Sequence, residues 1–479
     1  MQKKYFKLLV VALILILEWI LLQLIGSLDN KLRYTVFAGS MMIACWVTEL
    51  VPLYITGFLP LLIFPLLGVN TIKSTAQAYG NPVIFVFIGG FFIATALEKH
   101  KVHLRMALWI LKQYGDSLQN VLYSIVFLTA ILSMWISNTA TAILILPVVL
   151  GVLEYLKGNA FISDQTYQNF SKSLVLSIAY AANAGGIATI IGTPPNLVAI
   201  SILDELNIYH ISFSQWLLIG VPFTLLLLTG LVIVFKWIYP VHANDKMKEL
   251  KKYFLKQYEM LGPPKYAQKA SIAVMSLVAI LWITKDFIAK KMGITAPDDA
   301  TIAVLGIFLL FIIPSKNAQN ETLLTFEDSR KVPWDLWVLF GGGLALADAL
   351  DKSGILKMAG GFLIESLNVH SMTFIVLLGA ITILFTEFMS NVAQVTVLTP
   401  LIIAIARESG LDVLPIVIYV TILSSCGFMM PMGTPPNAIA FGTGFVSMKD
   451  MMKTGFLINL VSLIVAFLLY LSLQSLNIF

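Results

Sequence analysis

The sequence Gly-Thr-Pro-Pro-Asn occurs twice, at residues 192–196 and again at residues 433–437, and each copy lies inside a long apolar stretch. Two consecutive prolines cannot continue a helix, because each ring removes a backbone N–H donor and clashes with the preceding turn. The two copies therefore predict two breaks at which helical backbone groups lose their partners. In a membrane, such backbone is tolerated only where it is buried in protein or lines a cavity.

The composition predicts an all-α polytopic membrane protein. Of the 479 residues, 58% are hydrophobic and 12% are charged, whereas about a quarter of the residues of an ordinary soluble domain are charged. Apolar segments of about 20 residues, the length that spans a lipid bilayer, recur along the chain. A transmembrane β-barrel is excluded, because its strands would give short alternating segments instead.

The N-terminus carries an orientation signal. The first apolar segment, 8–25, follows Lys3, Lys4 and Lys7. It is longer than the roughly 7–15 apolar residues of a signal peptide, and no small-residue cleavage site follows it, so we expect a retained span. Because positive charge stays in the cytoplasm, we expect a cytoplasmic N-terminus on a multi-pass protein of the inner (cytoplasmic) membrane. Most of the net charge of +5 lies in loops, which the same rule explains, so no nucleic-acid partner is expected.

Three segments recur in the same order in the two halves of the chain. The pairs are 85–102 with 337–354, 133–150 with 386–403, and 191–200 with 432–441. The Lys-rich stretch between the halves is also expected in the cytoplasm. With a cytoplasmic start and the first span outside the repeat, each half then has an odd number of crossings. The second half must then enter the membrane upside down. An inverted-topology repeat of this kind is typical of transporters that bind their substrate near the midplane, between the two repeats.

These features divide the chain into four parts. They are a first transmembrane helix (1–30), a first inverted repeat (31–240) with a hairpin tip at 137–139, a cytoplasmic linker (241–268), and a second inverted repeat (269–479) with a hairpin tip at 390–392. Helices are expected over 5–25, 35–50, 52–68, 83–112, 121–157, 171–203, 214–238, 269–289, 300–315, 334–350, 371–407, 412–443 and 454–476. This pattern predicts about 11 transmembrane helices plus two re-entrant helical hairpins, 121–157 and 371–407, which are too long for one span.

Short polar residues mark the middle of each hairpin. They are Ser137-Asn138-Thr139 in the first and Ser390-Asn391-Val392 in the second. The second arm of each hairpin begins at the tip, and the free N–H groups of such a helix end attract anions. The glycines of the two Gly-Thr-Pro-Pro-Asn breaks permit unusual backbone angles, and unwound carbonyls can coordinate a cation.

The polar breaks lie in regions without basic residues. No Lys or Arg occurs in 121–156, 174–235, 371–406 or 408–448. A bound anion would therefore be stabilised by helix N-termini, hydroxyls, amides and bound cations. This set of groups suits a small carboxylate together with a sodium ion.

In these tips and breaks the sequence resembles the divalent anion/sodium symporter family, which includes dicarboxylate and citrate transporters. The resemblance covers nearly the whole chain after the first span. It implies a homodimer, and a scaffold domain along which a transport domain moves like an elevator. It further implies sodium-coupled symport of small dicarboxylates of the succinate, malate, fumarate and 2-oxoglutarate class. Val392 stands where many members have threonine, which removes one hydroxyl contact.

The resemblance also implies two sodium sites beside one substrate site, and no other cofactor. The first sodium site would comprise Ser133, Ser137, Asn138 and Gly192. The second would comprise Thr386, Met389 through its carbonyl, Asn391 and Gly433. The substrate carboxylates would meet Ser137, Asn138, Thr139, Thr193 and Pro194 from the first half, and Ser390, Asn391, Val392, Thr434 and Pro435 from the second.

Several alternatives stay open at this point. Some members of the family exchange one dicarboxylate for another without sodium, and a carrier of sulfate, citrate or arsenite belongs to the same class. A membrane-embedded lipid enzyme would need a catalytic cluster, and none is visible in the sequence. An ATP-driven pump would need a phosphate-binding loop, and the sequence contains no G-x-x-x-x-G-K-[ST] motif. A channel would need a continuous pore, whereas two hairpins that meet centrally indicate a closed site.

Two smaller features have both a functional and a structural interpretation. Glu387 precedes Ser390 by three residues, and an intramembrane carboxylate is either functional or a buried acid bonded to the neighbouring break. His100 and His103 have helical spacing that could suit a metal, but a third ligand is missing nearby.

Overall fold

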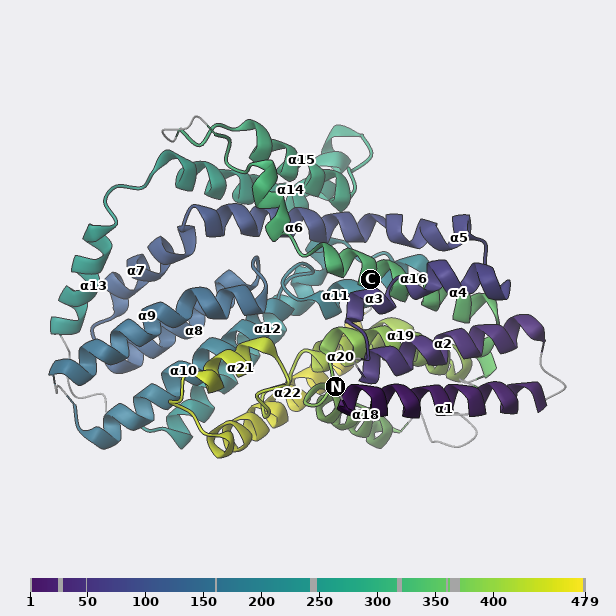
Figure 1. Ribbon diagram of the computed structural model, residues 1–479. Helices are drawn as coiled ribbons and strands as arrows, with labels where there is room; N and C mark the ends of the chain where they lie inside the picture. The colour runs from purple at the N-terminus through teal and green to yellow at the C-terminus, as the bar shows by residue number, and fades with distance from the viewer. Residues whose placement is uncertain are drawn as a thin grey trace.

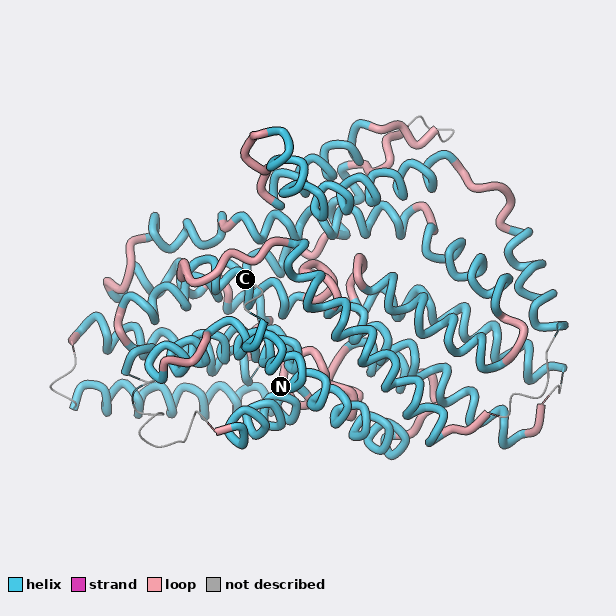
Figure 2. The backbone as a smooth tube through the Cα atoms, turned by 180° about the vertical axis from the view of Figure 1, so that it is seen from behind, coloured by secondary structure: helices cyan, strands magenta, loops and turns pink. Residues whose placement is uncertain are grey.

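The computed structural model describes residues 2–24, 29–48, 50–159, 162–241, 248–316, 321–358, 361 and 371–476. Over these ranges the chain is helical apart from its connecting loops and one isolated β-bridge, Pro314 to Thr322 (Figure 2). The all-helical fold expected from composition is confirmed. The interfacial position expected for Glu49 and the loop positions expected for His242 and His370 concern residues outside the described ranges.

The helices of the first half begin with α1 (Gln2–Leu24), α2 (Asn30–Thr48), α3 (Leu53–Thr56), α4 (Leu59–Leu67), α5 (Ile72–Gln77), η1 (Ala78–Gly80), α6 (Pro82–Lys99) and α7 (Val102–Tyr114). They continue with α8 (Leu118–Ser133), α9 (Asn138–Asn159), α10 (Asp164–Ile187), α11 (Pro194–Glu205), α12 (Phe213–Ile238) and α13 (Lys248–Met260). The second half contains α14 (Tyr266–Met292), α15 (Asp299–Ile312), η2 (Phe326–Lys331), α16 (Trp334–Lys352), α18 (Met372–Thr386), α19 (Asn391–Ser409), α20 (Val413–Ser424), α21 (Pro435–Gly442) and α22 (Met448–Leu476).

Many of these helices are apolar over a membrane-spanning length. Within the described part of the chain, six are long and apolar enough to cross a membrane. They are Pro82–Lys99, Asn138–Gly158, Phe213–Ile238, Tyr266–Met292, Asn391–Ser409 and Met448–Ser475. Shorter apolar helices, among them both first arms of the hairpins, Leu118–Ser133 and Met372–Thr386, accompany them.

Several local features differ from the sequence-based expectation, among them the helix expected over 52–68, which is divided into α3 and α4. The helix expected over 83–112 is in fact two helices, because Lys101 adopts a left-handed conformation with φ +53° that ends α6 and starts α7. The segment expected as a linker contains the amphipathic helix α13, which packs against α7 and whose Leu250 and Phe254 are fully buried. The apolar spacing of i, i+4 in that segment is the signal of such a helix, but its many lysines obscure it.

Two helical hairpins and two broken helices form the centre of the molecule. The hairpins are α8–α9, joined by 134–137, and α18–α19, joined by 387–390. The broken helices are α10 and α11 on either side of 188–193, and α20 and α21 on either side of 425–434. In Figure 1, α7, α8, α9 and α13 gather at one end of the molecule and α1, α2, α4 and α5 at the other, with α11 and α20 between them.

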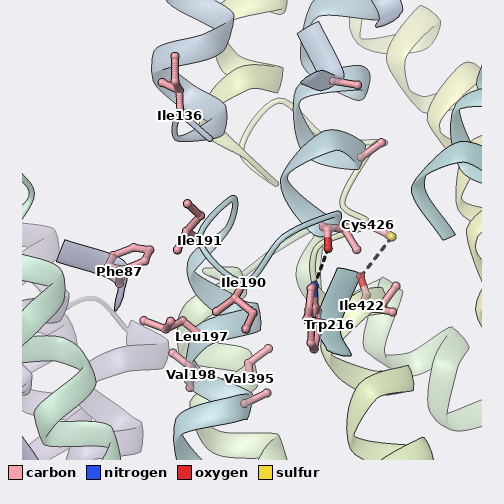
Figure 3. Packing of buried hydrophobic residues seen from close by; sticks show 14 of the residues in the cluster. Phe87, Ile136, Ile190, Ile191, Leu197, Val198, Trp216, Val395, Ile422 and Cys426 are labelled. Atoms are coloured by element: carbon pink, nitrogen blue, oxygen red, sulfur yellow. Dashed lines mark hydrogen bonds between the residues drawn. The ribbon is translucent and has the colours of Figure 1, made fainter. Parts of the chain in front are cut away.

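Close backbone approach fixes the first hairpin on its broken helix. A Cβ atom added to Gly185 of α10 would lie 2.5 Å from the Cα of Ala130 in α8, which a real side chain could not tolerate. Beyond the break, Leu197 and Val198 of α11 lie between Phe87 of α6 and Val395 of α19 (Figure 3). This core therefore holds the break rigidly between helices from both halves of the chain.

Candidate functional site

The two hairpin tips and the two Gly-Thr-Pro-Pro-Asn breaks line one cavity of about 740 Å³, within the usual range for small-molecule sites. Every residue that the resemblance assigned to substrate contact lines it: Ser137, Asn138, Thr139, Thr193, Pro194, Ser390, Asn391, Val392, Thr434 and Pro435. No charged side chain is among the described residues that line the cavity. Polar groups for an anion must therefore come from amides, hydroxyls and helix ends.

The first tip is shaped by its own polar side chains. The Ser133 hydroxyl donates to Oδ1 of Asn138 at 2.7 Å, and Ser137 Oγ accepts from the backbone N–H of Ala140 at 3.3 Å. Ser137 thus caps the N-terminus of α9, as short hydroxyl residues commonly do. The tip is tied to the neighbouring break because Thr189 Oγ1 donates to the carbonyl of Met134 at 2.5 Å.

Asn196 stabilises the first break by satisfying carbonyls that the broken helix leaves without partners. Its Nδ2 donates to the carbonyls of Ile187 at 3.2 Å and Thr189 at 2.9 Å. The indole of Trp216 in α12 donates to the same Ile187 carbonyl at 2.9 Å. A dashed line at Trp216 in Figure 3 marks a hydrogen bond of its ring nitrogen. The Asn of the motif therefore supplies hydrogen-bond donors to the last carbonyls of α10, which have no partner within the helix.

The second tip repeats the pattern of the first. Thr386 Oγ1 lies 2.7 Å from Oδ1 of Asn391 and 2.5 Å from the carbonyl oxygen of Ser424, so these two acceptors share its single proton. Thr386 and Asn391 lie 253 positions after Ser133 and Asn138 (386 − 133 and 391 − 138). One difference separates the tips, because Ser390 makes no capping hydrogen bond with its side chain. The Ser390 hydroxyl is therefore not committed to the start of α19, unlike the hydroxyl of Ser137.

The second break is also held by the Asn of its motif. Asn437 Nδ2 donates to the carbonyls of Gly427 and Met430, both at 3.0 Å. Thr434 Oγ1 accepts from the N–H of Asn437 at 3.3 Å and caps α21. The same amide-to-carbonyl device thus stabilises both broken helices.

Several oxygen atoms lie close to Gly186 and Gly192, near the residues expected to form the first sodium site. A Cβ added to Gly192 would lie 2.5 Å from the carbonyl oxygen of Gly186 and 2.9 Å from that of Ser133. A Cβ added to Gly186 would collide with Oδ1 of Asn138 and lie 3.1 Å from the carbonyl oxygen of Gly192. Glycine is required at both positions because the oxygens approach so closely. Such a set of uncharged oxygens is the kind of ligand that a hard cation prefers.

The second site has a comparable arrangement and one added charge. A Cβ on Gly427 would lie 3.2 Å from the carbonyl oxygen of Thr386, and a Cβ on Gly433 would lie 3.3 Å from that of Met430. The latter would also lie 3.0 Å from Oε2 of Glu387. At the second site, Met389 lines the cavity and Thr386 does not. Ser133 and Gly192 of the first site do not line the cavity either.

Glu387 has a structural role in this conformation. Its Oε1 accepts from the backbone N–H groups of Phe428 and Met429, each at 2.9 Å, and its Oε2 accepts from that of Met430 at 2.8 Å. Asn459 of α22 adds a fourth hydrogen bond at 2.8 Å. The carboxylate thus supplies acceptors for three amides that the break would otherwise leave without partners. This geometry favours the structural interpretation of Glu387.

Another part of the cavity wall was not predicted from the sequence. It comes from the α2–α3 corner, α6 and the start of α16, and its residues are Trp46, Val47, Thr48, Leu53, Phe91, Pro333 and Leu336. These residues are mostly apolar and widely separated in sequence, so no motif marks them. Asn183 of α10 was missed for a similar reason, because one amide in a run of small residues gives no repeat signal.

Over the described ranges, no group of three His, Cys, Asp or Glu side chains is placed to hold a metal ion. His100 Nε2 instead lies 2.9 Å from the carbonyl of Leu323.

Comparison with known proteins places this chain in a family. A family model described as the sodium:sulfate symporter transmembrane region matches residues 2–476. The sodium-dependent dicarboxylate transporter SdcS of Staphylococcus aureus strain USA300 is 36% identical over 433 residues, which cover 88% of this chain and 82% of the relative. SdcS of strain bovine RF122 / ET3-1 is 35% identical over the same shares of the two chains.

A solved structure supports the fold. The YdaH transporter of Alcanivorax borkumensis superposes with a TM-score of 0.56 over 84% of this chain and 88% of its own, at 12% sequence identity. A likeness at that identity concerns the fold alone. The matched family and relatives are membrane transporters, not enzymes, so the lipid-enzyme alternative is rejected. The chain is an all-α polytopic membrane protein that belongs to the sodium:sulfate symporter family.

Proposed function

We propose that this protein is a secondary active transporter of small dicarboxylates of the succinate, malate, fumarate and 2-oxoglutarate class, driven by sodium symport. The observation that carries the proposal is the convergence of both hairpin tips and both breaks on one uncharged polar cavity. The names of the SdcS relatives, sodium-dependent dicarboxylate transporters, point to the same substrate class and coupling ion.

The substrate carboxylates would be held by helix ends and short polar side chains. Asn138 and Thr139 stand at the start of α9, and Asn391 stands at the start of α19. Thr193 and Thr434 precede α11 and α21. Because the N-termini of these helices carry partial positive charge, a dianion can be stabilised between them without a lysine or arginine. Ser137, Ser390, Val392, Pro194 and Pro435 would complete the contact surface.

Two sodium ions would sit beside the substrate. The first would be held by Ser133, Ser137, Asn138 and Gly192, and the second by Thr386, Met389, Asn391 and Gly433. The crowded carbonyl and amide oxygens around Gly186 and Gly192 support the first assignment. No other cofactor is proposed.

Electrostatic interactions would couple the binding of sodium to the binding of the substrate. Without cations, the carbonyl and amide oxygens at the tips would repel the carboxylates of the substrate. Sodium ions that satisfy those oxygens remove this repulsion and orient Asn138 and Asn391. Each ligand then raises the affinity of the protein for the other, because such coupling is reciprocal.

The proposal includes a mechanism and a topology. The chain would comprise the first helix (1–30), inverted repeats over 31–240 and 269–479, and a cytoplasmic linker (241–268), with its N-terminus in the cytoplasm. The hairpins and broken helices would form a transport domain that moves as an elevator against a scaffold, within a homodimer in the cytoplasmic membrane. Support comes from the cavity wall of α2, α3, α6 and α16, which belongs to no hairpin or broken helix.

The test is uptake of labelled succinate by purified protein in liposomes. External sodium is replaced by lithium or choline, and internal dicarboxylate is either present or absent. Uptake that requires sodium supports symport. Uptake that requires only internal dicarboxylate would replace symport with exchange. Failure to take up any di- or tricarboxylate would remove the proposal.

A further inference from the structure

Asn183 joins the two halves of the site. It belongs to α10 in the first half, lines the cavity and is fully buried. Its partners, Thr434 and Asn437, belong to the second break, more than 250 residues later in the chain. Asn183 is therefore placed to control how the second break presents its polar groups to the cavity.

The orientation of the Asn183 amide follows from its neighbours. Asn437 Nδ2 has two hydrogens, and it donates both to the carbonyls of Gly427 and Met430. Asn437 Oδ1 therefore remains as an acceptor, and Asn183 must turn its NH₂ group toward it. Asn183 Nδ2 lies 3.4 Å from that oxygen and 2.9 Å from Oγ1 of Thr434. The hydrogen-bond network thus fixes which end of the amide faces the break.

The same network fixes the hydroxyl of Thr434. A threonine hydroxyl has two lone pairs and one proton. Thr434 Oγ1 accepts from Asn183 Nδ2 at 2.9 Å and from the N–H of Asn437 at 3.3 Å. Both lone pairs are therefore engaged, and the hydroxyl can act toward the cavity only as a donor. An anion, which can only accept hydrogen bonds, matches such a group.

We propose that Asn183 is a positioning residue for substrate recognition, which holds the Thr434 hydroxyl as a hydrogen-bond donor to a substrate carboxylate. The inference rests on the proposed dicarboxylate function. Oδ1 of Asn183 is buried and has no hydrogen-bond partner among the described residues, so the printed hydrogen bonds of this amide all run from its NH₂ group to the second break.

Only the threonine of the second break is held by an asparagine in this way. Thr193, the matching threonine of the first break, makes no capping hydrogen bond with its side chain. The position that corresponds to Asn183 in the second half is Ser424 (183 + 241), whose hydroxyl donates to Val420 within its own helix. The two carboxylates of the substrate are therefore recognised unequally, one by a donor fixed in advance and one by a hydroxyl that is free to adapt.

A double-mutant cycle tests the inference. Succinate affinity is measured by sodium-dependent thermal stabilisation, and succinate KM by uptake in liposomes, for N183A, T434V and the double variant. N183A should weaken succinate affinity about tenfold, as expected for loss of a charge-assisted hydrogen bond. In the T434V background, N183A should add less than roughly a twofold loss, because the two residues act through one hydroxyl.

Matched variants separate positioning from structure. T434S keeps the hydroxyl, so the full effect of N183A should persist in that background. S177A removes another buried hydroxyl of α10, which bonds within its own helix, and should leave succinate affinity unchanged. If N183A does not fold, Asn183→Ser, which lacks the amide donor but stays polar, enters the same cycle.

The outcomes distinguish this inference from the proposed function. Additive losses from N183A and T434V, in a protein that transports succinate, overturn the positioning role and leave the proposed function standing. Absence of dicarboxylate transport by the unaltered protein overturns both.

Discussion

Asn459 Nδ2 donates a hydrogen bond to Oε1 of Glu387 at 2.8 Å, and both residues are buried. The contact joins the long helix α22 to the second hairpin at its tip. Through Glu387 it also reaches the backbone amides of the second break. The first hairpin tip contains no matching acid, since position 134 (387 − 253) is Met. One hairpin tip is therefore organised around a carboxylate and the other around hydroxyl and amide groups.

Glu387→Gln should destabilise the protein. The substitution places an NH₂ donor among groups that are themselves donors, so at least one buried N–H loses its acceptor, at a cost of about 1–3 kcal/mol. Thermal unfolding of the purified protein in detergent measures the loss. Glu259→Gln on the exposed face of α13 is the control and should unfold with the unaltered protein. Equal unfolding of both variants would contradict the structural role of Glu387.

Asn138→Ala and Asn391→Ala should each lower succinate uptake at least tenfold, because each removes an amide that would contact both substrate and ion. Both variants should remain folded in membranes, which size-exclusion chromatography of the extracted protein checks. Asn120→Ala, at an exposed position of α8, should transport normally. Full activity of both tip variants would show that the site is misplaced.

Ser133→Ala and Thr386→Val should weaken activation by sodium. Each variant loses the hydroxyl that orients the neighbouring Asn, a contribution of about 1 kcal/mol, or about fivefold in the sodium concentration for half-maximal uptake. The measurement is succinate uptake against external sodium. Thr382→Val, one turn earlier in α18, loses only a hydroxyl bonded to Leu378 in its own helix. An equal sodium shift in this control would refute a specific role for Thr386.

Asp328, in η2 outside the candidate spans, should make stability depend on pH. Burial raises the pKa of its carboxyl, but hydrogen bonds from Lys99 and Thr325 lower it by more, so the pKa lies below its ordinary value of 3.8. A lowered folded-state pKa stabilises the protein above the ordinary value, and the stabilisation disappears as pH falls through the folded pKa. Asp328→Asn should therefore unfold at a lower temperature than the unaltered protein at pH 7.

The measurement for Asp328 is the difference in unfolding temperature between the two proteins at pH 7 and near pH 3. The difference should shrink at the lower pH, because the carboxyl of the unaltered protein becomes protonated as well. Asp335→Asn, a neighbouring acid for which no ion pair is recorded among the described residues, is the control. A difference that stays constant with pH would exclude the Lys99–Asp328 pair as its source.

Much of the site could be predicted from the sequence because its elements recur. Ser137–Thr139 and Ser390–Val392, like the two Gly-Thr-Pro-Pro-Asn segments, are polar breaks in apolar helices, and their duplication identified them. In the structure, these four segments line one cavity. The sequence could not settle Glu387, since an acid three residues before a tip suits either interpretation. Only the hydrogen bonds from the second break favour the structural interpretation.

The sequence by itself determined the membrane class, the two breaks and the residues at the tips, because hydropathy and proline chemistry act locally and leave a local record. Only the tertiary structure decided the apolar wall from Trp46 to Leu336, the turn at Lys101, and the contact of Asn183 with Thr434. Those features depend on which side chains meet across hundreds of residues. Packing selects such partners by shape and hydrogen-bond geometry, and neither is written in a short stretch of sequence.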